Sequence, residues 1–330
     1  MTDLKLAQSF SMIALNAQSS LYMTTVKKAA LRCMAAAVIL ELYLDSAFTQ
    51  TENKFILKND VIDQSHTMLY RETILKPLLY KKAGIKDDLK WWLKRASTLP
   101  RKKLMKFEHA ISDSLKAIDL LEEIPNLLGC DLYYDSAGVA IKEYRSNIEA
   151  YSRITENIRA EILEDGSVTE EIICMIWLLR ESGCMHDFFS RNELEKVNAR
   201  MNELYQSVLL AKVLFPIQIH HGIEIAIKQF LHMKKRFVKT AVGSSINFFF
   251  PMLERSQAVF IETEAWFSNS NKRLNNVISR LESYGHEVKV LEKGPISTIK
   301  IDNLVYEAVP HVVYMRVPIQ GVRLLPKRPI

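Results

Sequence analysis

Apolar side chains recur every three to four residues over most of the first 240 positions, which is the spacing of an amphipathic α-helix. The most regular segment is 24–44, where Leu31, Met34, Val38 and Leu42 fall near one stripe. The other segments with helical spacing are 5–17, 60–80, 86–97, 100–123, 141–164, 168–182, 191–213 and 217–240. The pattern therefore predicts a mainly α, multi-helical fold for this part of the chain.

Two shorter segments alternate between apolar and polar positions, which is typical of β-strands. Residues 47–57 (AFTQTENKFIL) carry a central Thr-Glu-Asn and predict a short hairpin. Residues 127–141 (LLGCDLYYDSAGVAI) predict a second hairpin. Each segment follows a long helix, so we expect two helix-then-hairpin units.

The pattern changes after Gly243. Residues 258–267 resemble a strand, and 268–284 form a polar helix with Gly285 at its C-cap. Short strands follow, with the sequences HEVKVL, STIKI, LVYEAV, HVVYMRV and VRLL. We expect a helical domain at 1–240 and a small α+β module at 241–330.

Composition and charge support this division. Only 10 glycines and 10 prolines occur in 330 residues, which favours helices over a fold with many turns. The net charge is −1 over residues 1–232, whereas residues 233–330 carry fifteen Lys and Arg against eight Asp and Glu. A basic module of this kind suggests a negatively charged partner, although solubility alone explains the excess equally well.

The sequence contains none of the common catalytic motifs, so we expect no enzymatic activity. G-x-G-x-x-G, the P-loop, G-x-S-x-G and H-E-x-x-H are all missing. Glu262 and Glu264 with Glu287-x-Lys289 are reminiscent of metal-dependent nucleases. A helix separates the two parts, however, and a simple surface pair accounts for Glu287 and Lys289.

Cysteine spacing predicts buried free thiols, with neither a metal nor a cofactor. The four cysteines, none of them in a C-x-x-C pair, are Cys33, Cys130, Cys174 and Cys184. Cys184 and His186 supply only two of the four ligands of a structural zinc site. The adjacent His220 and His221 do not face the same way on a helix.

The chain is expected to be cytoplasmic, with at most peripheral membrane contact. Its first residues lack the apolar region of a signal peptide. The apolar run Cys33–Leu40 is far shorter than the roughly 20 residues that span a bilayer.

Residues 31–44 (LRCMAAAVILELYL) resemble the signature helix of the Golgi phosphoprotein 3 family, in which Leu-Arg-Gly-Cys-Met leads into Glu-Leu-Ala-Leu. Further motifs follow the family's order: Leu4-Lys5-Leu6, Phe55-Ile56-Leu57, Trp91-Trp92-Leu93, Leu120-Leu121-Glu122-Glu123 and 172–179 (IICMIWLL). The resemblance covers about residues 1–232 and leaves the C-terminal module unexplained.

Members of that family are mostly helical peripheral membrane proteins that bind phosphatidylinositol 4-phosphate in a surface pocket and insert a hydrophobic hairpin into the bilayer. In eukaryotes they retain glycosyltransferases at the Golgi. The resemblance therefore implies a non-enzymatic protein that binds phosphatidylinositol 4-phosphate or another anionic phospholipid. The family's later Arg pair falls near His109 and Ser112, which favours general anionic-lipid binding over strict headgroup specificity.

Two basic helix starts are the candidate headgroup site. A helix N-terminus favours anions, and each Lys or Arg adds about 1 kcal/mol near an anionic membrane. The candidate residues are Lys27, Lys28, Arg32, Lys102, Lys103, Lys106 and His109. The alternative is a solvated basic face without a ligand.

The candidate membrane anchors are Leu128, Leu132, Tyr133 and Tyr134, within the expected hairpin Leu127–Val139. An oligomer contact, or a strand packed on the body, explains these apolar residues equally well. Trp91 and Trp92 are expected to be core residues rather than interface anchors.

The alternative function is nucleic-acid binding, or an adaptor role, through winged-helix-like units and the basic C-terminal module. Lys234, Lys235 and Arg236 would add to such a surface. The near-neutral charge of residues 1–232 makes nucleic acid the less favoured partner. Protein clients and a homo-oligomer are compatible with the sequence.

Overall fold

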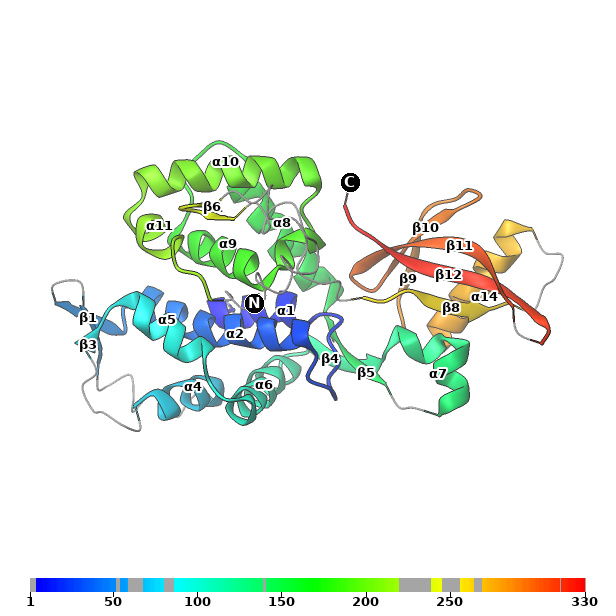
Figure 1. Ribbon diagram of the computed structural model, residues 1–330, viewed down its shortest axis with the longest axis horizontal. Coiled ribbons are helices and arrows are strands. Elements are labelled where there is room, and N and C mark those ends of the chain that lie inside the picture. Colours follow the sequence, from blue (N-terminus) through cyan, green and yellow to red (C-terminus); the bar gives the residue numbers. More distant parts are fainter. Residues whose placement is uncertain are drawn as a thin grey trace.

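The computed structural model describes residues 4–51, 54–58, 68–79, 86–138, 141–219, 239–244, 256–263, 269–314 and 316–329. Figure 1 shows two parts side by side, a larger helical body and a smaller sheet built from the C-terminal residues. The expected combination of a helical part with a small C-terminal α+β part is confirmed.

Helix α2 (Thr25–Leu44) is the centre of the helical body. Thr24 caps its N-terminus by accepting a hydrogen bond from the backbone N–H of Lys27. From Leu31 onward nearly every side chain is buried, which is the pattern of a helix surrounded by protein. The prediction of a helix over 24–44 is thus confirmed.

The remaining helices of the body share one hydrophobic core with α2, and α1, α4, α5, α6 and α9 contact α2 directly. They are α1 (Leu6–Leu15), α4 (Leu69–Leu79), α5 (Leu89–Ser97), α6 (Arg101–Lys116), α8 (Ile148–Leu163), α9 (Glu170–Ser182), the short η3 (Cys184–Asp187), α10 (Arg191–Ser207) and α11 (Leu209–Leu214). In Figure 1, α9 lies on one side of α2, and α4 and α6 lie on the other. No helix in the described part of the chain is long and apolar enough to cross a bilayer.

Several predicted boundaries were wrong. The helix expected over 100–123 ends at Lys116, and Asp119 adopts a positive φ of 56° before strand β4 (Leu121–Pro125). The helix expected over 141–164 begins with a strand, β5 (Lys142–Ser146), and α8 starts only after the cap residue Asn147. The helix expected over 217–240 and the residues Lys234, Lys235 and Arg236 fall almost wholly outside the described residues, as do His220 and His221.

The first expected hairpin is confirmed. Strands β1 (Phe48–Thr51) and β2 (Lys54–Leu57) pair antiparallel, and β3 (Lys86–Asp87) adds a short third strand.

The second expected hairpin, Leu127–Val139, is wrong in its conformation. Strands β4 and β5 do pair, but between them the chain forms the 3-10 helix η2 (Leu127–Cys130) and the helix α7 (Leu132–Ala137). Asn126 and Asp131 cap these two turns with their side chains, so local capping overrides the alternating pattern.

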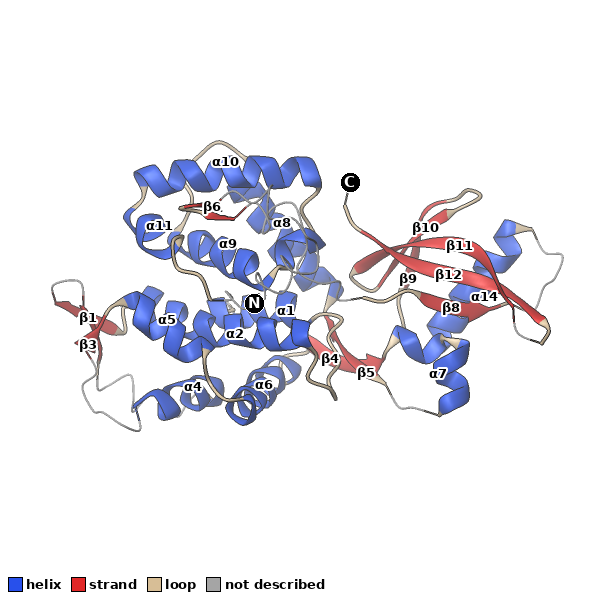
Figure 2. Ribbon diagram, viewed as in Figure 1, coloured by secondary structure: helices blue, strands red, loops and turns tan. Residues whose placement is uncertain are grey.

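The C-terminal part is a five-stranded antiparallel sheet in the order β8-β12-β11-β10-β9, covered on one face by α14 (Figure 2). Its elements are β8 (Val259–Glu262), α14 (Ser270–Ser283), β9 (Val288–Glu292), β10 (Ser297–Ile301), β11 (Leu304–Tyr314) and β12 (Pro318–Lys327). A minor pair, β6 (Lys239–Thr240) and β7 (Gly243–Ser244), precedes them.

The C-terminal sheet has its own hydrophobic core, and this core includes Leu127 and Cys130 from η2. The backbone N–H of Phe260 donates to Asp131 Oδ2 at 2.8 Å, and Arg280 pairs with Asp135 at 2.7 Å. The segment between β4 and β5 therefore packs with the C-terminal module, although it lies far away in sequence.

Gly321 lies where β12 and β8 leave no room for a side chain. It lies on β12 opposite Glu262, and an added Cβ would stand 2.3 Å from the carbonyl oxygen of Ile261 and 2.6 Å from the Phe260 ring.

We expect Gly321→Ala to lower the free energy of unfolding by about 1–3 kcal/mol, because β8 and β12 must separate to admit the methyl group. Chemical denaturation measures the loss. Gly129→Ala is the control, since its new Cβ would meet only a Tyr284 ring carbon at 4.0 Å. Equal losses in the two variants would contradict this account.

Candidate functional site

Lys27 belongs to the interior of the fold. Its side chain is only 2% exposed and its Nζ lies 2.5 Å from Glu108 Oε1 on α6. Lys27 also donates to the carbonyl oxygen of Ser19 at 2.6 Å, and the Tyr144 hydroxyl donates to Glu108 at 3.1 Å. A lysine held in this way does not reach a headgroup, so its assignment to the lipid site was wrong.

The other predicted residues of α2 differ in exposure. Lys28 is exposed, whereas Arg32 is half-buried. The structure thus leaves Lys28 as the fully accessible cation among the three predicted on α2.

The predicted residues of α6 all reach solvent. Lys102, Lys103, Lys106 and His109 are exposed. Lys102, Lys106 and His109 follow one another at spacings of four and three residues, so they share one face of the helix. The structure brings α2 and α6 together at the buried pair of Lys27 and Glu108, not through the exposed cations.

The basic surface extends beyond the predicted residues onto α5. Over residues 89–109 every Lys and Arg is exposed, and Glu108, the only acidic residue, is buried. The exposed cations are Lys90, Lys94, Arg95, Arg101, Lys102, Lys103 and Lys106. We call these seven side chains the α5–α6 basic surface. The α5 half was not among the predicted headgroup residues, because Lys90 is separated from Lys94 and Arg95 by apolar residues and no continuous basic run marks this helix.

Trp92 confirms the expectation of a core residue. It is buried, and its Nε1 donates to the carbonyl oxygen of Phe55 at 3.2 Å. Trp91 is half-buried, and its ring meets that of Trp92 edge-on with a centroid separation of 5.2 Å.

The candidate anchors do not form an apolar insertion loop. Leu128 packs against the C-terminal core, and Leu132 is half-buried. Tyr133 is 70% exposed, while Tyr134 lines a cavity. Because α7 is fixed to the C-terminal module by Asp131 and Asp135, the expected hairpin insertion has no structural counterpart in these residues.

That cavity has a volume of about 350 Å³ and lies between the start of α2, the η2 segment and the C-terminal sheet. Tyr22, Leu127, Tyr134 and Tyr306 are on its wall, and Glu143 is the charged residue there. None of the described residues that line it is Lys or Arg. A largely apolar cavity whose described lining includes no basic side chain is unsuited to a phosphate group, so it is not the expected headgroup pocket.

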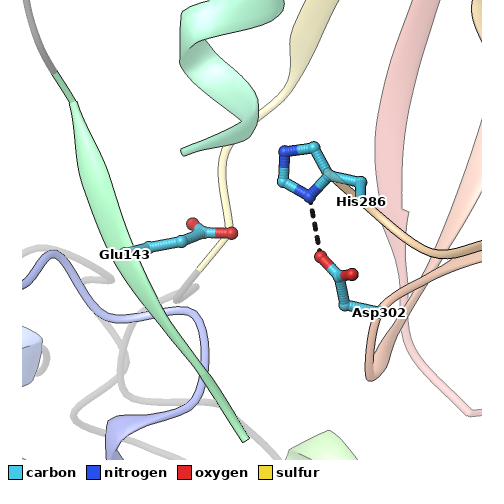
Figure 3. Close-up of side chains that lie close together, drawn as sticks. All are labelled: Glu143, His286 and Asp302. Carbon is cyan, nitrogen blue, oxygen red and sulfur yellow. Dashed lines mark hydrogen bonds and ion pairs between the residues drawn. The ribbon is translucent and has the colours of Figure 1, made fainter. Parts of the chain in front are cut away.

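A second cluster lies beside this cavity, where the two parts of the molecule meet. Glu143 on β5, His286 after α14, and Asp302 in the turn between β10 and β11 place one potential ligand atom each within 4.8 Å of one another. Figure 3 shows the Glu143 carboxylate and the His286–Asp302 pair on either side of a common space. His286 Nδ1 lies 2.8 Å from Asp302 Oδ2.

Local structure positions each member of the cluster. Gly285, with φ of 89°, ends α14 and turns His286 toward the body. Asp302 adopts a positive φ of 53° in the tight β10–β11 turn. Its Oδ1 accepts hydrogen bonds from Arg145 Nη1 at 2.9 Å and from the backbone N–H of Glu287 at 3.0 Å.

Burial dominates the electrostatics of the cluster. It raises the pKa of Glu143 to about 8, and the negative charge of Asp302 acts in the same direction. Burial also acts to raise the pKa of Asp302, but the partners of that carboxylate, His286 first among them, lower it overall. Two carboxyl groups at one site therefore have very different proton affinities.

Sequence reasoning missed this cluster. Position 143 was expected in a helix and position 286 in a strand, and nothing in the pattern connects either of them with position 302. A glycine C-cap followed by a histidine is a weak local signal for His286.

The other candidates from the sequence are not brought together. Glu262 is the last residue of β8 and Glu287 precedes β9, and these strands lie at opposite edges of the sheet. Glu264 lies outside the described residues. All four cysteines are buried and outside any disulfide, as expected, and burial raises the pKa of Cys33 and Cys174.

We expect Lys27→Met to lower the free energy of unfolding by about 3–5 kcal/mol, because Glu108 would stay buried without its cation. Lys28→Met is the matched control, and its exposed site should change stability by no more than about 0.5 kcal/mol. Urea denaturation followed by far-UV circular dichroism measures both. If the Lys27 variant were as stable as the Lys28 variant, the ion pair would have no structural role.

A comparison of the sequence with models of known protein families finds no match, and a comparison with curated proteins finds none either.

Proposed function

We propose that this protein binds anionic phospholipid surfaces as a peripheral membrane protein, with phosphatidylinositol 4-phosphate among its lipids, and that it does so without catalysis. The observation that carries the proposal is the α5–α6 basic surface. Seven exposed cations follow one another along residues 89–109, and the only acidic residue of that stretch is buried.

The burial of Glu108 is what makes this stretch strongly basic. An exposed carboxylate among the lysines would repel a negatively charged membrane and offset one of the cations. Paired with Lys27 inside the fold, Glu108 is withdrawn from the surface. Each Lys or Arg near an anionic membrane contributes about 1 kcal/mol, and the attraction falls off within a Debye length of about 10 Å at 0.1 M salt.

Apolar contact with the membrane would come from exposed apolar side chains of the helical body. Met105 lies on α6 between Lys103 and Lys106 and is 37% exposed. Leu21 and Tyr22, which precede α2, are 51% and 57% exposed. These residues replace the segment Leu127–Val139 in the proposed mechanism, since that segment packs with the C-terminal module.

Vesicle co-sedimentation tests the proposal. We expect binding to phosphatidylcholine vesicles that contain phosphatidylinositol 4-phosphate or phosphatidylserine, and none to phosphatidylcholine alone. The triple variant Lys102→Ala, Lys103→Ala, Lys106→Ala should reduce the partition coefficient roughly a hundredfold, because it removes about 3 kcal/mol of attraction. Added salt should weaken the binding of the native protein.

The matched control removes three exposed lysines from the C-terminal module: Lys272→Ala, Lys289→Ala and Lys293→Ala. It lowers the net charge by the same amount and should bind vesicles nearly as well as the native protein. Equal losses in the two triple variants would mean that overall charge, not the α5–α6 basic surface, drives adsorption. Failure to bind vesicles, together with salt-dependent retention on DNA, would instead support the nucleic-acid alternative.

A further inference from the structure

The cluster of Glu143, His286 and Asp302 has features that lipid adsorption does not use. It lies in the interior, where the helical body meets the C-terminal module, and each of its three residues comes from a different element (Figure 3). His286 is 3% exposed and Glu143 is 7% exposed. A titratable side chain that is buried in this way needs hydrogen bonds or ion pairs that replace its lost contacts with water.

The described residues supply only some of the hydrogen bonds that His286 and Glu143 could form. His286 Nδ1 is engaged with Asp302, but Nε2 of the same ring is buried and has no hydrogen-bond partner there. No described residue donates a hydrogen bond to the Glu143 carboxylate either. A buried carboxylate with unused acceptor capacity therefore faces the His286–Asp302 pair across the common space (Figure 3).

The cluster and its direct neighbours also contain more acidic groups than basic ones. Glu143, Asp302 and Glu122 are acidic, and Arg145, which pairs with both Glu122 and Asp302, is the one cation in direct contact with them among the described residues. Glu122 is exposed to solvent, so Glu143 and Asp302 are the two largely buried carboxyl groups, and Arg145 is shared with Glu122. A metal cation would add positive charge where these two carboxyl groups face each other.

From these observations we propose that Glu143, His286 and Asp302 bind one divalent transition-metal ion that joins the C-terminal module to the helical body. One imidazole and two carboxylates are a donor set that suits zinc or manganese. Metal–ligand bonds of about 2.0–2.2 Å place two ligand atoms roughly 3–4 Å apart, so small side-chain rotations bring these atoms to bonding distance. A cavity of about 10 Å³ borders Glu143 and Asp302, which is room for one ion or water.

In the proposed site, His286 Nδ1 and Asp302 Oδ2 are ligand atoms on the same side of the imidazole, 2.8 Å apart. The ion takes the place of the proton that they share, and Glu143 supplies the third ligand atom. Arg145 and the backbone N–H of Glu287 hold the Asp302 carboxylate from its other side. The positions of the ligands thus depend on contacts from both parts of the molecule.

The experiment uses the full chain, stripped with a chelator, incubated with ZnCl2 or MnCl2 and passed through gel filtration. We expect one ion per chain by elemental analysis and a rise in the melting temperature. Glu143→Gln, His286→Gln and Asp302→Asn should each abolish stoichiometric binding. Glu143→Gln keeps the side-chain shape and removes a buried titratable group, so it should fold even if a histidine variant does not.

The controls are Glu262→Gln and His311→Ala, which remove an exposed carboxylate and an exposed imidazole from the same module. Both should retain the ion. The proposal is overturned if the native chain binds neither metal stoichiometrically, or if Glu143→Gln and His286→Gln bind it as the native chain does. Vesicle binding is measured in a separate experiment. The absence of metal binding would therefore not contradict the proposal that the protein binds anionic lipid.

Discussion

The buried ion pair between Lys27 and Glu108 is the interaction on which the arrangement of the molecule depends. Both side chains are almost fully withdrawn from water, so each ion needs the other to offset its desolvation. The pair connects the start of α2 to the middle of α6, and the Tyr144 hydroxyl extends it to β5. Three segments far apart in sequence are thereby held in one relative position, and the C-terminal module packs against the last of them.

Strand β5 connects the helical body to the C-terminal module, because successive side chains of a strand point to opposite sides. Tyr144 and Ser146 face the helical body, where the Ser146 hydroxyl donates to the carbonyl oxygen of Met12. Glu143 and Arg145 face the C-terminal module and meet the turn that holds Asp302. Strand β5 therefore contacts the helical body with one side and the C-terminal module with the other. The proposed metal site exists only where both of these contacts are formed.

The ion pair also decides where positive charge reaches the surface. Residues 1–232 have a net charge of −1, so any attraction to a membrane must come from a local surface. By enclosing Glu108, the fold leaves no exposed acidic side chain between the first and the last of the seven cations, Lys90 and Lys106. The excess charge of the C-terminal module is spread over a sheet and a helix, and it is partly paired, as with Arg280 and Asp135 or Lys327 and Glu307.

The sequence by itself determined the helix over 24–44, the β1–β2 hairpin and the change to strands after Gly243, because hydrophobic period and capping residues act within one segment. It also indicated that Lys102, Lys103 and Lys106 lie at a basic helix start. Only the tertiary structure decided that Lys27 is buried, that 127–138 is helical and packs on the C-terminal module, and that Glu143, His286 and Asp302 converge. The physical reason is that periodicity reports which side of an element is buried, whereas burial of a charge, or a cluster of ligands, depends on what the rest of the chain places opposite it.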